Sequence, residues 1–196
     1  GGATSGNSFV LGQLDGAETI LICEGYATGI SLHCASGLPV VITFYAGNLK
    51  PVGAALRLRY PHSALVFCAD DDRWKPGTPE FKVGEIKARA VAEAVNGFVV
   101  LPLFDGLPLE SEPTDFNDLH TLAGLPQLKA QLSNALANCQ APHRRREAFE
   151  AEIDATDDFE TLTAALPRRI LDSGLPKATI SYLLKRIAKK ARVPVA

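Results

Sequence analysis

Hydrophobic residues in the first half of the chain form short apolar runs, separated by segments in which apolar residues recur at helical spacing. Short runs that end at glycine, proline or charged residues are typical of buried β-strands. Four such runs are present, at Thr19–Cys23, Leu38–Phe44, Ala64–Ala69 and Phe98–Leu103. A looser alternation over Phe9–Leu14 predicts an additional edge strand.

The segments between these runs carry helical patterns, at Tyr26–Ser36, Asn48–Arg59 and Pro79–Asn96. In the third segment one face is apolar, formed by Val83, Ile86, Ala90, Val91 and Ala94. Strands and helices that alternate over short connections imply right-handed crossovers. The pattern therefore predicts an α/β fold with a parallel four-stranded sheet flanked by helices.

Helical patterns dominate the rest of the chain. A loop rich in proline, glycine and acidic residues precedes Thr114–His120, which should open a helix, and Leu125–Cys139 predicts another. Gln140–Pro142 marks an expected boundary, so we expect one domain at 1–140 and a helical extension at 141–196. Within the extension, short amphipathic helices are predicted at Arg144–Ile153, Phe159–Leu166 and Thr179–Ala191.

Charge is distributed unevenly between these two regions. Residues 1–140 hold nine Lys/Arg and fourteen Asp/Glu, whereas residues 141–196 hold eleven and eight. Lys177–Arg192 contains six basic residues and no acidic one. The charged face of this last helix, which includes Lys185 and Lys189, suits a DNA backbone or a partner domain. An ordinary helix of an amphipathic bundle is an equally good interpretation.

Cysteine usage and hydropathy indicate a cytoplasmic protein. The four cysteines lack paired C-x-x-C spacing, which argues against a zinc site, and Cys23 and Cys68 lie in apolar runs as buried thiols would. A reducing compartment fits this usage. No apolar run approaches the roughly 18 residues of a membrane span, and no signal peptide opens the sequence.

Acidic residues follow two of the predicted strands. Glu24 ends the first strand, and Asp70, Asp71 and Asp72 end the third. Parallel strands place their carboxyl ends at one edge of a sheet, so these groups should meet there. In extended chain Asp70 and Asp72 point to the same side, with Cα atoms roughly 6.6 Å apart. Carboxylates are the ligands that Mg²⁺ prefers, which predicts a metal site.

Two simpler interpretations stay open for these acids. Three adjacent aspartates are tolerated as a solvated loop, without any cation. Glu24 precedes a predicted helix, where a negative charge stabilises the helix N-terminus.

Four sequence motifs occur in order across residues 19–120 and together resemble the Toprim domain. They are ILICEGYATG (Ile20–Gly29), AGNL (Ala46–Leu49), LVFCADDD (Leu65–Asp72) and DFNDL (Asp115–Leu119). The Toprim fold is shared by DnaG-type primases, type IA and II topoisomerases, OLD-type nucleases and recombination repair proteins. The variant is most similar to that of primases and primase-helicases carried by phages, plasmids and integrative elements. The resemblance does not extend to residues 141–196.

The resemblance implies a Rossmann-like Toprim fold and a metal-dependent DNA primase. Such an enzyme synthesises short RNA primers from ribonucleoside triphosphates on single-stranded DNA, with Mg²⁺ or Mn²⁺, and can be coupled to a helicase. It implies that Glu24 acts as general acid/base at the metal site and that Asp70 and Asp72 are metal ligands. Asp115 and Asp118 match a further acidic cluster that helps a second metal. Asp71, the variable middle residue, is expected to be dispensable.

The sequence departs from the cellular primases after the acidic run. Arg73 and Trp74 follow, where that family has a glycine two residues on. The substrate contacts of this loop therefore cannot be carried over. Trp74 itself suits either base stacking or a packing anchor.

Further candidates have ordinary alternatives. Asn48 could contact a nucleotide or cap the helix that it opens, and Lys82 and Lys87 could reach phosphates or form solvated helix surface. For the whole domain two other functions remain open. It could cut DNA as Toprim nucleases do, or it could be a non-catalytic module that binds DNA or couples to a helicase.

Overall fold

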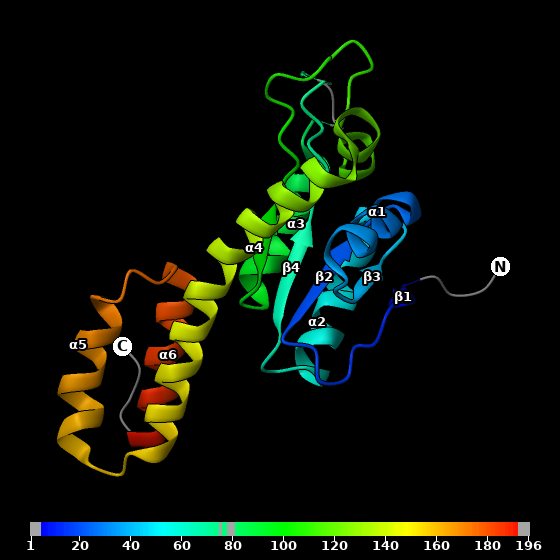
Figure 1. Cartoon of the computed structure of the whole chain (residues 1–196). Helices are drawn as coiled ribbons and strands as arrows, with labels where there is room; N and C mark the ends of the chain where they lie inside the picture. The colour runs from blue at the N-terminus through cyan, green and yellow to red at the C-terminus, as the bar shows by residue number, and fades with distance from the viewer. Residues whose placement is uncertain (1–4, 75, 78–80, 192–196) are drawn as a thin grey trace. The chain divides into compact units, whose positions relative to one another are not determined.

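The computed structural model describes residues 5–74, 76–77 and 81–191, and its contacts divide the chain into two units. The first unit is Gly1–Cys139 and the second is Gln140–Ala196. Figure 1 labels their helices and strands. No helix within the described ranges is both long and apolar enough to cross a membrane.

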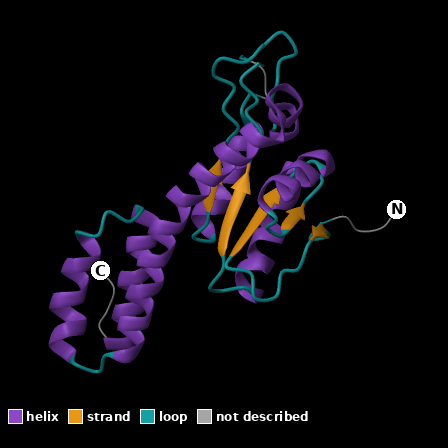
Figure 2. Ribbon diagram, in the orientation of Figure 1, coloured by secondary structure: helices purple, strands orange, loops and turns teal. Residues whose placement is uncertain are grey.

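The first unit is built on a five-stranded sheet (Figure 2). Its strands are β1 (Phe9–Leu11), β2 (Thr19–Cys23), β3 (Val40–Ile42), β4 (Ala64–Cys68) and β5 (Phe98–Val100). They lie in the order β1-β3-β2-β4-β5, with β1 antiparallel to β3 and the other neighbours parallel. The four predicted parallel strands are confirmed. The sheet has a fifth strand because the alternating segment at the N-terminus pairs along the edge of β3.

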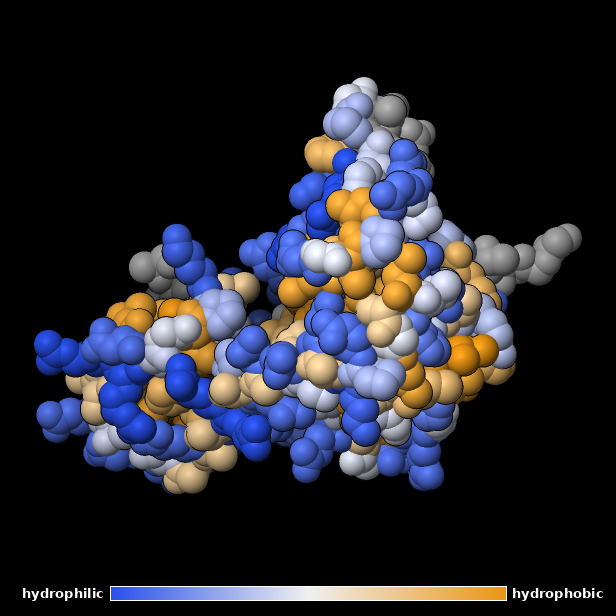
Figure 3. All heavy atoms as spheres, turned by 45° about the horizontal axis from the view of Figure 1, so that its top comes forward, coloured by the Kyte–Doolittle hydropathy of each residue, from blue (hydrophilic) through white to orange (hydrophobic). Residues whose placement is uncertain are grey.

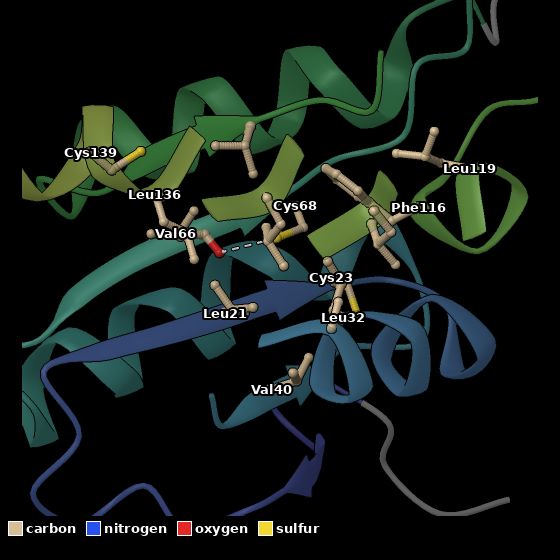
Figure 4. Close-up of a cluster of buried hydrophobic side chains, with 14 of the residues drawn as sticks. Leu21, Cys23, Leu32, Val40, Val66, Cys68, Phe116, Leu119, Leu136 and Cys139 are labelled. Carbon is tan, nitrogen blue, oxygen red and sulfur yellow. Dashed lines mark hydrogen bonds between the residues drawn. The ribbon is translucent and has the colours of Figure 1, made fainter. Parts of the chain in front are cut away.

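Helices cover both faces of this sheet. Packed on one face are α1 (Tyr26–Ser36) and the first part of α4 (Phe116–Ala155), and on the other are α2 (Leu49–Arg59) and α3 (Val83–Ala94). Alternate side chains of β2 enter opposite cores. Leu21 belongs to the core that also contains Phe116 and Leu119 (Figure 4), whereas Ile20 enters the core under α2 and α3. Burial on both faces explains why the central strands are apolar without alternation.

Helix α3 differs from its prediction in orientation. The expected positions 79 and 80 lie outside the described residues, and α3 begins at Val83. Ile86, predicted on the apolar face, is 61% exposed, while Glu85 is buried. Glu85 is accommodated because Lys82 and Arg89 lie 3.5 and 2.8 Å from its carboxylate oxygens. These two ion pairs let the helix turn a carboxylate inward.

Helix α4 is interrupted at Gly124, which has φ 79° and ψ 163°. This matches the predicted break between two helices at the end of the first unit. In the first unit, a short 3₁₀ turn, η1 (Ala46–Asn48), directly precedes α2. No helix ends at Gln140–Pro142, contrary to the prediction, because α4 continues to Ala155. The contacts nevertheless divide the chain between Cys139 and Gln140.

The second unit is helical and has its own core. After α4 it contains the π-helical turn η2 (Thr161–Ala165), α5 (Leu166–Leu171) and α6 (Lys177–Ala191). Its core residues include Phe149, Ile153, Leu166, Leu183 and Ile187. Hydrophilic side chains are prominent on the surface of each unit (Figure 3). Cys23 and Cys68 of the first unit are buried thiols, as predicted.

Candidate metal and nucleotide site

The carboxyl ends of β2 and β4 bring the predicted acids together. The two strands pair in parallel, with Ile22 opposite Phe67, so Glu24 and Asp70 emerge at the same edge. The first turn of α3 closes the site from the other side. A Cβ on Gly84 would lie 3.3 Å from Glu24 Oε1 and 3.4 Å from Asp72 Oδ2. The Gly84 N–H also donates to Asp72 Oδ2 over 3.4 Å.

Burial and the charges of neighbouring carboxylates raise the pKa of two of these acids, Asp70 and Glu24. Burial raises the pKa of Asp70 to about 7, with further contributions from the charges of Glu24, Asp115, Asp72 and Asp118. Burial, followed by the charge of Asp72, also raises the pKa of Glu24, and Lys87 opposes this. Five carboxylates therefore contribute to one region of negative potential.

One oxygen in this region lacks a donor. Glu24 Oε1 is buried and has no hydrogen-bond partner among the described residues. A buried carboxylate oxygen without a donor is unfavourable unless a cation reaches it. Within the described ranges no three His, Cys, Asp or Glu side chains form a ready-made metal cluster. Mg²⁺ commonly keeps several waters and takes phosphate oxygens, so this open carboxylate set fits a hydrated cation shared with a nucleotide.

Asp115 and Asp118 lie close enough to affect Asp70, but their oxygens already have partners. Thr28 Oγ1 donates to Asp115 Oδ2 over 2.6 Å, and the Asp118 N–H donates to Asp115 Oδ1 over 2.8 Å. Asp118 Oδ2 accepts from the Thr114 N–H over 2.7 Å, as an acid does near a helix start. These bonds fix the start of α4 beside α1. The two acids add negative potential to the site from fixed positions.

Asp71 points to a different environment. It is 4% exposed and is bonded by the Arg73 guanidinium, with Nε 2.7 Å from Oδ2. Its N–H donates to Thr114 O over 2.7 Å, and Trp74 Nε1 donates to Pro113 O over 2.8 Å. The middle aspartate and Trp74 thus tie the loop after β4 to the segment before α4. The hydrogen bond of Trp74 fits the predicted anchor, and base stacking stays a prediction.

One of the two roles predicted for Asn48, the helix cap, is wrong, and its contact with a nucleotide stays a prediction. Its side chain makes no cap bond, and the residue is 1% exposed. Its Nδ2 donates to Asn7 O and Thr43 O over 2.6 and 3.0 Å, and its Oδ1 accepts from the Gly6 N–H over 2.7 Å. Asn48 fixes the N-terminal segment against the end of β3.

The four lysines that were predicted to contact anionic substrates have different surroundings. Lys87 is exposed on α3, and its charge acts on Glu24. Lys82 pairs with Glu85 and lies 5.8 Å from the centre of the Phe81 ring. Lys185 and Lys189 are exposed on α6 of the second unit.

Gly84 and Thr28 complete the site and were not predicted from the sequence. An isolated glycine inside a helical pattern can have a packing or functional reason, and Gly84 is such a glycine. Thr28 had no comparable signal, because its role depends on the position of Asp115, 87 residues away.

An α/β sheet with acids beyond its strand ends defines a ligand-binding domain of the Rossmann-like class. A family model described as a Toprim domain matches residues 19–125, more than half of the sequence, and the chain belongs to this family. The Toprim prediction is thereby confirmed. No solved structure matches the chain.

Two similar proteins are both named DNA primase TraC, from Escherichia coli. The chain is 35% identical to one over 140 residues, 64% of its own length, and 37% identical to the other over 91 residues, 46% of its length. The matches cover 13% and 6% of those proteins. The chain therefore spans a small part of the length of these relatives.

Proposed function

We propose that this chain carries the catalytic unit of a DNA primase. It would transfer nucleotides in a metal-dependent reaction and synthesise short RNA primers on single-stranded DNA, in the replication of a mobile element. The gathering of Glu24, Asp70 and Asp72 around Gly84 carries the proposal, because such a carboxylate set suits a cation that binds phosphate. Membership of the Toprim family and similarity to proteins named DNA primase support it.

In this proposal the side chains have distinct tasks. Asp70 and Asp72 would hold Mg²⁺ or Mn²⁺, and the bound cation would supply Lewis-acid chemistry to the primer hydroxyl and the leaving pyrophosphate. Glu24, whose pKa is raised, accepts the proton from the 3′-hydroxyl. Gly84 keeps the site open and orients Asp72 through its N–H. Asp115 and Asp118 favour cation binding by adding negative potential.

Basic residues are assigned to the anionic substrates. Lys87, which lies near Glu24, and Lys82 would contact nucleotide phosphates. Lys185 and Lys189 on α6 would contact the DNA backbone. Residues 1–140 would then be the catalytic domain, and 141–196 a weakly basic extension that binds template or a helicase.

The test is incubation of the chain with single-stranded DNA, Mg²⁺ or Mn²⁺ and labelled ribonucleoside triphosphates. New short products are expected, and the Asp70→Asn/Asp72→Asn double variant should abolish them while its circular dichroism is unchanged. Glu93→Gln/Glu110→Gln, at two exposed acids of the first unit, is the charge-matched control. Full primer synthesis by the double aspartate variant would refute the proposal.

The same assay separates the other two functions. Shortened DNA in place of new product would favour a Toprim nuclease that uses the same carboxylates. Neither product, with DNA binding intact, would favour a non-catalytic binding or helicase-coupling module.

A further inference from the structure

Exposed aromatic side chains gather at one corner of the sheet. Six aromatic residues are among the large hydrophobics exposed in the described ranges, and four of them lie around the carboxyl ends of β2 and β3. These four, the aromatic corner, are Phe9, Tyr26, Phe44 and Tyr45, which are 44%, 50%, 58% and 43% exposed. Their rings contribute little to either core, so burial does not explain their placement.

Backbone contacts place this corner beside the carboxylates. The Phe44 N–H donates to Glu24 O over 3.0 Å, and Tyr26 follows Glu24 by two positions. Phe9 of β1 pairs with Ile42 of β3 at the edge of the sheet, and Ile42 precedes Phe44 by two positions. The ring centres of Phe9 and Tyr26 are 5.7 Å apart. The aromatic corner is therefore continuous with the site that contains Glu24.

Phe44 is held in an unfavourable backbone conformation. Its φ is 69°, a value that bulky residues rarely adopt. The turn is fixed on both sides, because the Thr43 N–H donates to Cys23 O over 2.9 Å and Asn48 Nδ2 donates to Thr43 O over 3.0 Å. Strained backbone that presents an exposed ring is a recurrent feature of binding sites.

Tyr45 is also restrained. A Cβ on Gly47 would lie 3.1 Å from Tyr45 Cε2 and 3.3 Å from its Cδ2, so the ring lies against the Gly47 backbone. A side chain at position 47 would displace it. The Cδ2–Cε2 edge of the Tyr45 ring thus lies against Gly47, and the residue remains exposed.

We propose that the aromatic corner binds unpaired nucleobases of a nucleic-acid strand and guides that strand to Glu24. Aromatic rings stack on every base, whereas the neighbouring carboxylates repel phosphates, so affinity here must come from the bases. Lys50, exposed in the first turn of α2, offers a cation to the strand's backbone. The choice of nucleic acid as the occupant rests on the proposed function, and the recognition of bases rests on the rings.

The test is fluorescence anisotropy with a labelled single-stranded oligonucleotide and an abasic strand of the same length, in EDTA and without nucleotides. The unaltered chain is expected to bind the abasic strand at least about tenfold more weakly. Phe44→Gly removes a ring and places glycine where φ is positive, so the fold should be retained. Its affinity for the base-containing strand should fall about 5- to 100-fold. Tyr26→Ala should act in the same direction.

Leu58→Ala is the control, because Leu58 is an 86% exposed hydrophobic residue of α2 outside the aromatic corner. Its affinity should equal that of the unaltered chain. Three results would each overturn the proposal: no binding by the unaltered chain, equal binding of both strands, or full affinity in Phe44→Gly. Suppose that Phe44→Gly changes the sedimentation coefficient of the protein, and so its oligomeric state, but leaves DNA affinity unchanged. That result would also overturn the proposal, because it would assign the aromatic corner to a protein interface.

The assay requires no catalysis, so its failure can be distinguished from failure of the proposed function. Base-dependent binding without primer synthesis by the unaltered chain would contradict only the primase assignment. Primer synthesis with full DNA affinity in Phe44→Gly would contradict only the role of the aromatic corner.

Discussion

The acids beyond β2 and β4 in the first unit and the acids near the end of α4 in the second have opposite surroundings. In the second unit, acids near the end of α4 have basic partners: Arg169 bonds Glu152, Arg186 lies 2.6 Å from Asp154, and Lys190 lies 3.4 Å from Asp157. In the first unit, acids at the sheet edge face one another. The comparison indicates that the first unit holds its unfavourable charges at a single place, beyond β2 and β4.

The energetic consequences of the two arrangements differ. Exposed ion pairs such as Arg186–Asp154 contribute about 0–1 kcal/mol each and mainly orient their helices. The buried, repelling acids of the first unit oppose folding at neutral pH, and both cores of the sheet must offset this. Repelling carboxylates that lower stability at one edge of the sheet are expected at a functional site, where a bound ligand relieves the repulsion.

The largest effect is expected from Glu24→Gln. The amide keeps the size of the side chain but cannot accept a proton, so primer synthesis should fall by about 10²- to 10⁴-fold. The free energy of unfolding should not decrease, because the substitution removes a repelling charge. Rate measurements at saturating nucleotide, with chemical denaturation of the same sample, test both expectations.

Glu93→Gln provides the control for this change. Glu93 is an exposed acid of α3 away from the carboxylate set, and its variant should retain full activity. Equal activities of the two variants would contradict the role assigned to Glu24.

Asp70→Asn should alter the dependence of stability on pH in the metal-free chain. Because the fold raises the pKa of Asp70 from 3.8 to about 7, the contribution of this group is fully present below about pH 4 and is lost as pH rises through about 7. Asparagine does not ionise, so the variant keeps its stability as pH rises. Its free energy of unfolding should therefore exceed that of the unaltered chain at pH 8 but not at pH 4. One pKa unit corresponds to about 1.4 kcal/mol, so the difference should reach a few kcal/mol.

Denaturation in EDTA at several pH values measures this difference. Saturating Mg²⁺ should stabilise the unaltered chain at pH 8 more than it stabilises the variant. Identical pH profiles for the two proteins would show that the repulsion at Asp70 is unimportant for stability.

Gly84→Ala should separate activity from stability. Alanine favours a helix over glycine by about 0.5–1 kcal/mol, but its Cβ would approach Glu24 Oε1 and Asp72 Oδ2 and displace them. Activity should therefore fall about tenfold, without loss of stability. Gly53→Ala is the contrasting variant, because its Cβ would lie 2.9 Å from Val91 Cγ1 in the core. That variant should lose about 1–3 kcal/mol of stability and keep its activity per folded molecule.

The sequence predicted features that depend on local pattern or on strand order. Apolar runs located all four parallel strands, and the rule for parallel sheets brought Glu24 and Asp70 to one edge. The orientation of α3 was missed, because periodicity cannot reveal that two ion pairs let Glu85 point inward. The internal bonds of Asn48 and the strain at Phe44 were missed as well. Both depend on contacts between segments far apart in sequence or on a backbone angle that no residue type signals.

The smallest effect is expected on DNA affinity from two exposed lysines of the second unit, compared with an arginine of the same helix that forms an ion pair. Lys185→Gln/Lys189→Gln should weaken binding to single-stranded DNA only a few-fold, because each lysine contributes one phosphate contact. The slope of log affinity against log salt should decrease by about 1.4, since each contact to a single strand contributes roughly 0.7. Stability should be unchanged, because both side chains are exposed. Affinity titrations across salt concentrations measure the slope.

Arg186→Gln is the matched control on the same helix. Its guanidinium is bonded to Asp154 and to the Tyr182 hydroxyl, so the substitution should lower stability by at most about 1 kcal/mol and leave the salt slope unchanged. If Arg186→Gln changes the slope and the lysine pair does not, the ion pairs of the second unit open on DNA. The contrast between the paired acids of the second unit and the repelling acids at the sheet edge would then hold only for the free chain.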